Sequence, residues 1–288
     1  MSTNTIKTYV LLAALGGFFI LIGGALFQGP GLWLGLFLGL AMVGGSYWFS
    51  DKVAVKAARA VPVTEAEAPA LYRIVRDLTT RANMPMPKLY VTPSLQPNAF
   101  ATGRNPEHAA VACTQGILQM LTEDELKGVL AHELSHVGNR DILIGSVAAT
   151  IAMGITFVAR MAMFGAMFGG GGGRDRNRNP IGELALAFLA PVAAMLLQMA
   201  LSRSREFEAD RSGALLLGTG EPLARALEKI EAGARQIPMD VNPAQAQAYI
   251  VNPLTGRKIQ AARLFMTHPA TEERIARLRQ MHPGAARF

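Results

Sequence analysis

Hydrophobic and polar residues are segregated along this chain into long blocks. No Asp, Glu, Lys or Arg occurs from Thr8 to Ser50. A turn at Gln28-Gly29-Pro30 divides this stretch into two apolar segments, Tyr9–Phe27 and Gly31–Phe49, each long enough to cross a hydrocarbon layer about 30 Å thick as a helix. Residues 8–50 are therefore expected to form a transmembrane hairpin. The rival interpretation of the first segment, a cleavable signal peptide, is disfavoured because its apolar run is too long.

Two more uncharged blocks, Ile142–Ala159 and Leu184–Ser202, predict a second apolar helix pair within residues 142–202. The loop between them, Gly169–Pro180, has five consecutive glycines and then three arginines with one aspartate. A crossing hairpin would place this positive charge on the outer face, against the usual preference for cytoplasmic Lys and Arg. We expect the pair to cross the membrane, and a re-entrant pair is the alternative.

Globular patterning is confined to residues 51–141 and 203–288. Lys88–Thr92 and Asn98–Thr102 predict two short strands, separated by prolines. The second is a candidate edge strand to which a peptide substrate could add, with Asn98 and Ala99 lining the cleft. A plain structural strand is the alternative for this segment.

The next element predicted is a helix that begins at a capping box formed by Thr122 and Glu125. Its sequence contains His132-Glu133-Leu134-Ser135-His136. One helical turn separates the two histidines, so both imidazoles project from one face and can share a Zn²⁺ ion. Glu133 faces the same cleft and can accept a proton from an attacking water molecule. The alternative, two core histidines beside a chance glutamate, requires a rare coincidence in a chain with five histidines.

A catalytic zinc site usually has three protein ligands, and no third histidine follows at short spacing. Acidic candidates occur in the stretch from Ser202 to Asp210, predicted as a helix. Glu206 and Asp210 are four residues apart and share a face, so one can bind metal while the other holds a histidine ring nitrogen. Glu208 lies on another side of the helix and is the weaker candidate. A solvated charged helix is the competing interpretation.

Composition supports a membrane protein over a nucleic-acid-binding protein. Half of the 288 residues are hydrophobic, only 17% are charged, and the mean hydropathy is +0.24. The net charge of +7 comes from scattered Lys and Arg residues without interleaved aromatics, so we expect no nucleic-acid partner. Lys7, Lys52 and Lys56 flank the first hairpin, which predicts that both of its ends are cytoplasmic. The single cysteine, Cys113, excludes an intramolecular disulfide.

The motif His132-Glu133-x-x-His136, followed by Ser202-Arg203-x-x-Glu206-Phe207-x-Ala209-Asp210, resembles the HtpX family of membrane-integrated zinc metalloproteases, relatives of the CaaX prenyl protease. Pro97–Gly103, His268-Pro269 and Arg274-Ile275 extend the resemblance over almost the whole chain. The resemblance implies one Zn²⁺ per chain bound by His132, His136 and Glu206, with Glu133 as catalytic base and Asp210 supporting a ligand. It also suggests His268 as an oxyanion stabiliser, for which a helix-entry residue is the alternative.

The expected architecture is an α-helical membrane protein with a small α+β zincin-like catalytic domain of the gluzincin type, built from residues 51–141 and 203–288. We expect a multi-pass protein of the cell inner membrane with both termini cytoplasmic. The expected activity is zinc-dependent hydrolysis of membrane or membrane-proximal polypeptides in protein quality control. The alternatives are a non-catalytic membrane adaptor with a structural zinc site and a CaaX-type peptide-processing protease. The sequence leaves the substrate preference and the oligomeric state open.

Overall fold

The computed structural model describes residues 58–141, 203–236 and 269–281, together with separate positions between 10 and 56. Every described position from 10 to 56 is helical. No helix within these described residues has the length and apolar character needed to cross a membrane. Most of the predicted hairpin in 8–50, the apolar blocks and glycine-rich loop of 142–202, and His268 lie outside the described residues.

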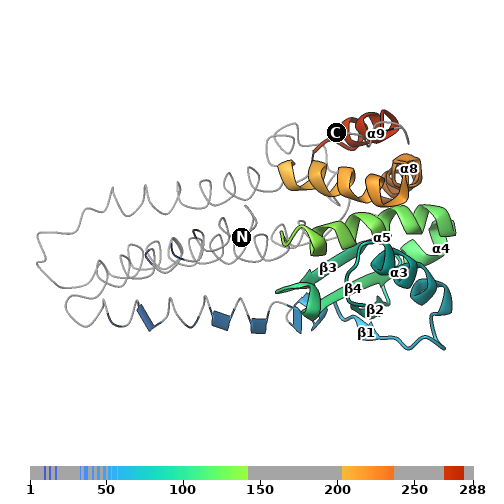
Figure 1. The fold of residues 1–288 in the computed structure, drawn as a ribbon. Coiled ribbons are helices and arrows are strands. Elements are labelled where there is room, and N and C mark those ends of the chain that lie inside the picture. The colour runs from blue at the N-terminus through green and yellow to red at the C-terminus, as the bar shows by residue number, and fades with distance from the viewer. Residues whose placement is uncertain are drawn as a thin grey trace, which may run out of the picture.

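The polar part of the chain forms three layers (Figure 1). A four-stranded sheet is the first layer, and a central helix, α5, lies against it with α3 beside it. The helical residues 203–217 and α8 cover the other side of α5, and α9 packs outermost on α8. The helices are α3 (Pro69–Arg81), α4 (Gln115–Met120), α5 (Glu123–Gly138), α8 (Glu221–Gln236) and α9 (Thr271–Arg279).

The sheet has the strand order β1-β2-β4-β3 and a mixed pattern of directions. β1 is antiparallel to β2, β2 is parallel to β4, and β3 is antiparallel to β4. Among the described strands, β3 pairs on one side only and is therefore an edge strand. The strand bounds are Val61–Pro62 for β1, Lys88–Thr92 for β2, Ala99–Gly103 for β3 and Ala109–Thr114 for β4, with a short 3₁₀ helix at Pro106–His108.

The two strands expected from the sequence are present, the first with the expected bounds and the second displaced by one residue. Asn98 directly precedes β3. Its carbonyl accepts from Thr114 N at 2.9 Å, and its N–H donates to the side-chain Oγ1 of Thr114 at 2.9 Å and not to a backbone carbonyl. These two bonds join Asn98 to the residue that ends β4. The main chain of Asn98 therefore faces the neighbouring strand.

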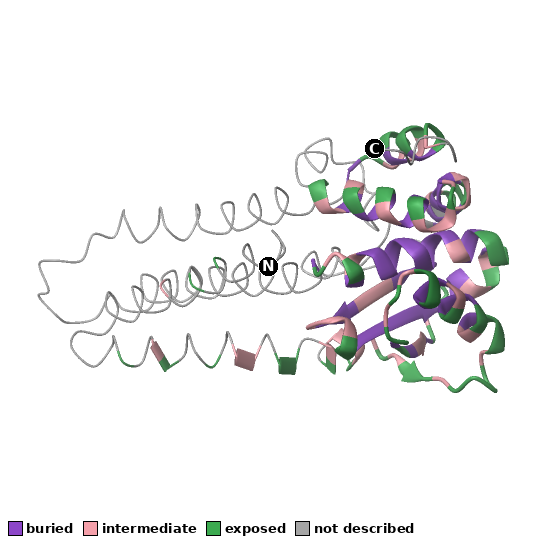
Figure 2. Cartoon of the chain, viewed as in Figure 1, coloured by how far each residue is buried: buried purple, intermediate pink, exposed green. Residues whose placement is uncertain are grey.

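Helix α5 begins at the expected capping box, in which Thr122 and Glu125 each accept a hydrogen bond from the other's backbone N–H. The Glu125 carboxylate also lies 2.7 Å from Lys229 Nζ on α8, which ties the start of α5 to the outer layer. Most of α5 is buried on all sides, as expected of a helix between two layers (Figure 2). A helix of this kind needs little amphipathicity, because both of its faces contact other elements.

Two glycines allow the helices to approach α5 closely. A methyl group at Gly128 would lie 2.5 Å from the backbone nitrogen of Leu223 at the start of α8. A methyl group at Gly213 would lie 3.0 Å from the backbone nitrogen of His132. Glycine at these positions therefore brings α8 and residues 203–217 close to the backbone of α5.

We expect Gly128→Ala to lower the stability of the full-length protein in detergent by about 1–3 kcal/mol, because the added methyl group meets backbone atoms that must move. Thermal unfolding followed by intrinsic fluorescence measures the effect. Gly138→Ala is the matched control on the same helix, since its methyl group would meet only the flexible Met84 side chain at 3.2 Å. Equal transition temperatures for the two variants would contradict the close packing of α8 on α5.

Candidate metal centre and active site

Helix α5 places the two histidines and the glutamate of the motif inside the molecule. The His132 side chain is 1% exposed and that of His136 is 16% exposed. Glu133 between them is also buried. The Nε2 atoms of the two imidazoles lie 3.2 Å apart and face the same point. The helical spacing thus brings two nitrogen donors together, as the sequence predicts.

Glu206, in the helical residues 203–217, completes a cluster of three potential metal ligands. Its Oε2 lies 3.6 Å from His132 Nε2, and its Oε1 lies 3.6 Å from His136 Nε2. Ligand atoms 2.0–2.1 Å from a tetrahedral zinc ion are about 3.4 Å apart, close to all three separations here. Two imidazoles and one carboxylate also form the donor set of several catalytic zinc sites, so the residues present fit this metal.

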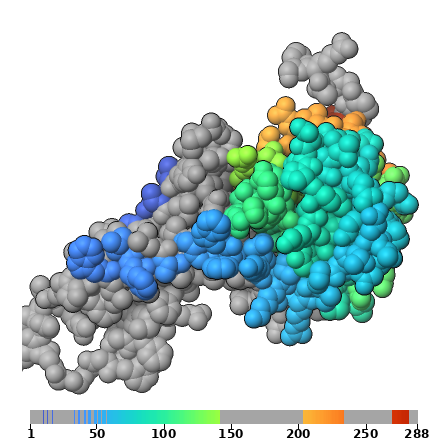
Figure 3. Space-filling view, turned by 60° about the horizontal axis from the view of Figure 1, so that its bottom comes forward, coloured from blue at the N-terminus to red at the C-terminus, as the bar shows by residue number. Residues whose placement is uncertain are grey.

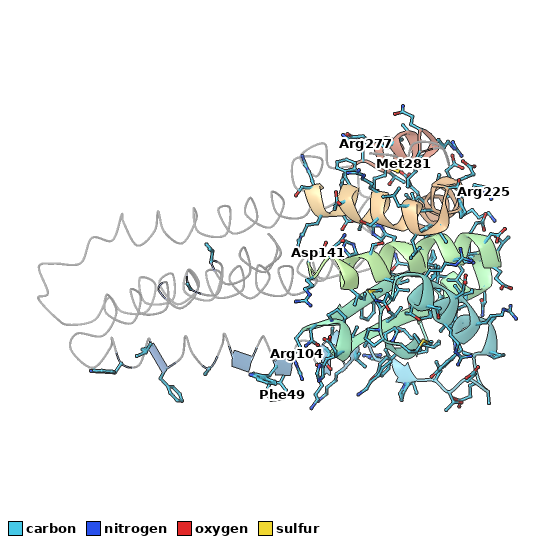
Figure 4. The ribbon with its side chains drawn as sticks, viewed as in Figure 1. Phe49, Arg104, Asp141, Arg225, Arg277 and Met281 are labelled. Atoms are coloured by element: carbon cyan, nitrogen blue, oxygen red, sulfur yellow. The ribbon has the colours of Figure 1, made fainter. Side chains whose placement is uncertain are left out.

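A carboxylate lies behind each histidine. His136 Nδ1 lies 3.0 and 3.1 Å from the two oxygens of Asp141, just beyond the C-terminal end of α5 (Figure 4). His132 Nδ1 lies 2.9 Å from Asp210 Oδ1. Each carboxylate favours a proton on Nδ1, which leaves the Nε2 lone pair for a metal.

The pKa of His136 reflects the same carboxylate. Burial lowers this pKa, but the charge and hydrogen bond of Asp141 outweigh burial and, with Glu206 and Glu133 adding to them, raise it to about 9. A metal ion therefore competes with a proton for His136 over most of the neutral range, and binding releases that proton.

Asp210 is bound on its other side by Arg274 of α9. The guanidinium Nη2 lies 2.7 Å from Asp210 Oδ1, and Nε lies 2.9 Å from Oδ2, so the pairing is bidentate. Arg274 Nη1 also lies 3.5 Å from Glu206 Oε2. The arginine is 1% exposed, and it contacts the two buried acidic residues of the 203–217 helix, Glu206 and Asp210.

Charge pairing at Arg274 outweighs the effect of burial on both partners. Burial alone would raise the pKa of Asp210, yet the nearby Arg274 and His132 hold it at about 2. The pKa of Arg274 is raised well above its usual value, because Asp210 and Glu206 offset the cost of burying its charge. Both groups are therefore fully charged at neutral pH.

Glu133 has a different environment from the other carboxylates. Its Oε2 accepts a hydrogen bond from the backbone N–H of Ala101 in β3, at 2.9 Å. The pKa of Glu133 is raised, first by burial and also by the nearby Glu206, although both histidines and the Ala101 N–H act against the rise. A carboxyl group with a raised pKa exchanges protons more readily near neutral pH.

The structure brings most of the expected residues together and adds two that the sequence reasoning overlooked. Glu208 is exposed, in agreement with its lower rank as a ligand. Asp141 was not expected, although an acid within two turns after His136 is a visible signal. Arg274 was noted only as part of a resemblance, because no local pattern connects it with residue 210. His268 lies outside the described residues.

We expect Asp141→Asn to weaken zinc binding by about 10- to 100-fold, because His136 loses the carboxylate that orients and polarises it. Competition with a fluorescent zinc chelator, using the full-length protein in detergent, measures the affinity. Asp124→Asn is the matched control, since Asp124 is exposed at the other end of α5. Unchanged zinc affinity in Asp141→Asn would show that this carboxylate does not support the ligand.

Arg274→Met is expected to lower stability by about 3–5 kcal/mol, because it leaves Asp210 charged and buried without its partner. Arg274→Lys keeps the charge but not the bidentate geometry, so its stability should lie between that of the unmodified protein and that of Arg274→Met. Thermal unfolding compares both variants with Arg279→Met, which removes an exposed arginine of the same helix. A transition for Arg274→Met that matches Arg279→Met would refute a structural role for the buried pair.

Comparison with known proteins agrees with this geometry. The sequence model of "Peptidase family M48" matches residues 65–282. The chain is 53% identical over 279 residues to a "Protease HtpX homolog" of Syntrophobacter fumaroxidans, covering 96% of this chain and 98% of the relative. It is 52% identical over 280 residues to another "Protease HtpX homolog", from Pelotomaculum thermopropionicum, covering 96% of this chain and 99% of that relative.

The fold is also similar to that in the crystal structure of S. mikatae Ste24p, with a TM-score of 0.55 at 22% identity. This likeness covers 96% of the chain and 65% of that longer protein. The resemblance drawn from the sequence motifs is confirmed, and with it the expectation of a zinc-dependent protease. The chain belongs to peptidase family M48.

Proposed function

We propose that this protein is a membrane-bound zinc endopeptidase that cleaves misfolded membrane or membrane-proximal polypeptides, with His132, His136 and Glu206 as metal ligands and Glu133 as general base. The observation that carries this proposal is the position of Glu133. Its carboxylate is buried beside the three-ligand cluster and bonded to an edge strand. A purely structural zinc site would have four protein ligands and no need for such a base.

The residues of the site divide the chemistry between them. His132, His136 and Glu206 would hold the zinc ion, which when bound would supply Lewis-acid activation of water and of the scissile carbonyl. Glu133 accepts the proton of the attacking water and later passes it to the leaving amine. Its raised pKa suits both transfers, since the carboxyl group must gain and lose a proton in each turnover.

Asp141 and Asp210 are proposed to orient the two histidines, and Arg274 to hold Asp210 and Glu206 in place. His268 is proposed as a donor to the oxyanion. Its support is the short connection to α9, which begins at Thr271 and carries Arg274 into the site. Neutral or protonated, its ring can donate a hydrogen bond to developing negative charge.

The free edge of β3 is the proposed position of the substrate peptide. In this antiparallel strand, N–H and C=O groups of alternate residues point to the same side. Asn98 faces β4 and Ala101 faces Glu133, so the outward groups are those of residues 99, 101 and 103. Ala99 is 1% exposed whereas Ala101 is half-buried, so the accessible part of the edge lies around Ala101.

The proposed topology places both termini and the catalytic part on the cytoplasmic side of the cell inner membrane. Asp141 directly precedes the apolar stretch 142–202, and Glu206 follows it by four residues. Residues of one metal cluster thus flank both ends of this stretch, so both ends lie on one side of the membrane. This placement favours substrates in or near the membrane.

Glu133→Gln should keep zinc but lose proteolysis by at least about 10²-fold, because the amide cannot accept the proton. Cleavage of an unfolded test protein by the full-length enzyme in detergent measures activity, and metal analysis measures bound zinc. Chelation should abolish activity of the unmodified enzyme, and added zinc should restore it.

Glu208→Gln is the matched control, because this exposed glutamate lies on the 203–217 helix outside the cluster. It should retain both zinc and activity. Undiminished cleavage by zinc-loaded Glu133→Gln would overturn the proposed mechanism.

A further inference from the structure

Surface cations in this molecule differ in whether they pair with a carboxylate and in whether they lie beside an exposed aromatic ring. Those on α3, α5, α8 and α9 pair with nearby carboxylates: Arg73, Arg76, Arg81, Lys127, Arg225, Lys229, Arg277 and Arg279. A second group, defined here as the junction cations, lies where the N-terminal segment meets the sheet, and it consists of Lys52, Lys56, Arg59 and Arg104. None of the junction cations forms an ion pair with any carboxylate that the structure describes, and the same is true of the exposed Lys88, Arg140, Arg203 and Arg211. The junction differs from those four positions in the aromatic rings beside its cations.

Two junction cations lie over exposed aromatic rings. The Arg104 guanidinium carbon is 4.7 Å from the centre of the Trp48 ring, and Lys52 Nζ is 5.6 Å from the centre of the Phe49 ring. Trp48 is 56% exposed and Phe49 is 53% exposed. Figure 4 shows Phe49 and Arg104 together where the N-terminal segment reaches the sheet. A ring exposed on one side with a cation beside it has the amphipathic character of a membrane-interface residue.

The N-terminal segment changes from aromatic to basic along its length. Trp33 and Phe37 are 75% and 68% exposed, and both precede Trp48 in the chain. Beyond Trp48, exposed lysines follow at spacings of four residues, at Lys52 and Lys56. This succession from apolar rings to unpaired cations matches the passage from hydrocarbon to lipid headgroups.

We propose that Trp48, Phe49, Lys52 and Arg104 form a binding site for anionic phospholipid headgroups, which fixes the N-terminal segment and the end of β3 at the membrane surface. The inference rests on the proposed membrane placement of this chain. Lipid is favoured over an acidic protein partner because exposed apolar rings continue along the segment as far as Trp33. Hydrocarbon chains would cover these rings, whereas an acidic surface would not. In Figure 3 the N-terminal segment runs along the visible surface and joins the sheet region there.

Charge complementarity supports an anionic lipid over a zwitterionic one. The residues from Trp48 to Arg59 contain three cations and one acid, and Arg104 adds a fourth cation from a separate element. Each Lys or Arg near an anionic membrane surface strengthens binding by about fivefold. Arg104 follows directly after β3, so a headgroup bound there touches the strand whose Ala101 contacts Glu133.

The chain has only two tryptophans, so Trp33→Phe leaves Trp48 as a single fluorescent reporter. The full-length variant is reconstituted into phosphatidylcholine vesicles in which about one lipid in five carries brominated chains, which quench tryptophan on contact. The brominated lipid is phosphatidylglycerol in one preparation and phosphatidylcholine in the other. We expect severalfold stronger quenching by brominated phosphatidylglycerol, weakening as salt is added.

Lys52→Gln combined with Arg104→Gln should reduce quenching to the level seen with brominated phosphatidylcholine. Arg73→Gln combined with Arg279→Gln is the matched control and should keep the preference, because these arginines belong to the paired group. Equal quenching by both lipids, or a preference that survives loss of Lys52 and Arg104, would overturn the lipid site. Absence of quenching by either lipid would instead refute the membrane placement of Trp48.

Discussion

The buried pairing of Arg274 with Asp210 is the contact on which the site depends. Four carboxylates, those of Glu133, Asp141, Glu206 and Asp210, lie buried around two histidines. Isolated charges at such depth are too costly to persist, so they require counter-charges. Arg274 supplies one, and the largely buried Arg205, which donates to the Asp141 carbonyl at 3.2 Å, supplies another. A divalent metal ion would supply the remaining two positive charges. The four carboxylates, when ionised, would then be neutralised.

This balance links three segments that are distant in the chain. The histidines and Glu133 belong to α5, Glu206 and Asp210 to the 203–217 helix, and the arginine to α9. The contacts from His132 to Asp210 and from Asp210 to Arg274 form only when all three helices are together, which the small Gly213 permits beside His132. Metal binding and docking of α9 therefore stabilise the same arrangement. Occupancy of the site should contribute to the stability of the whole polar part.

Features contained within one element could be predicted from the sequence, and features that depend on the assembled site could not. Helix α5 was predictable because its capping box and histidine spacing are local features within one element. The start of β3 was displaced by one residue, because the bonds of Asn98 to Thr114 depend on register with a strand more than ten residues away. The roles of Asp141 and Arg274 were not predicted, for a related reason. Their roles arise from charge compensation across the assembled site, and no periodicity in the sequence encodes that.

In the proposed membrane placement, strand β3 connects the metal site with the membrane surface. Ala101 binds Glu133 through its N–H, and three residues later Arg104 lies over Trp48. At about 3.3 Å per residue, these two points are about 10 Å apart along the strand. A peptide lying along this edge would then have its scissile bond only a few residues from the headgroup region. An enzyme placed in this way would reach chains that leave the bilayer in extended form. A folded domain would not fit, because its strands could not lie along β3 and against the membrane at the same time.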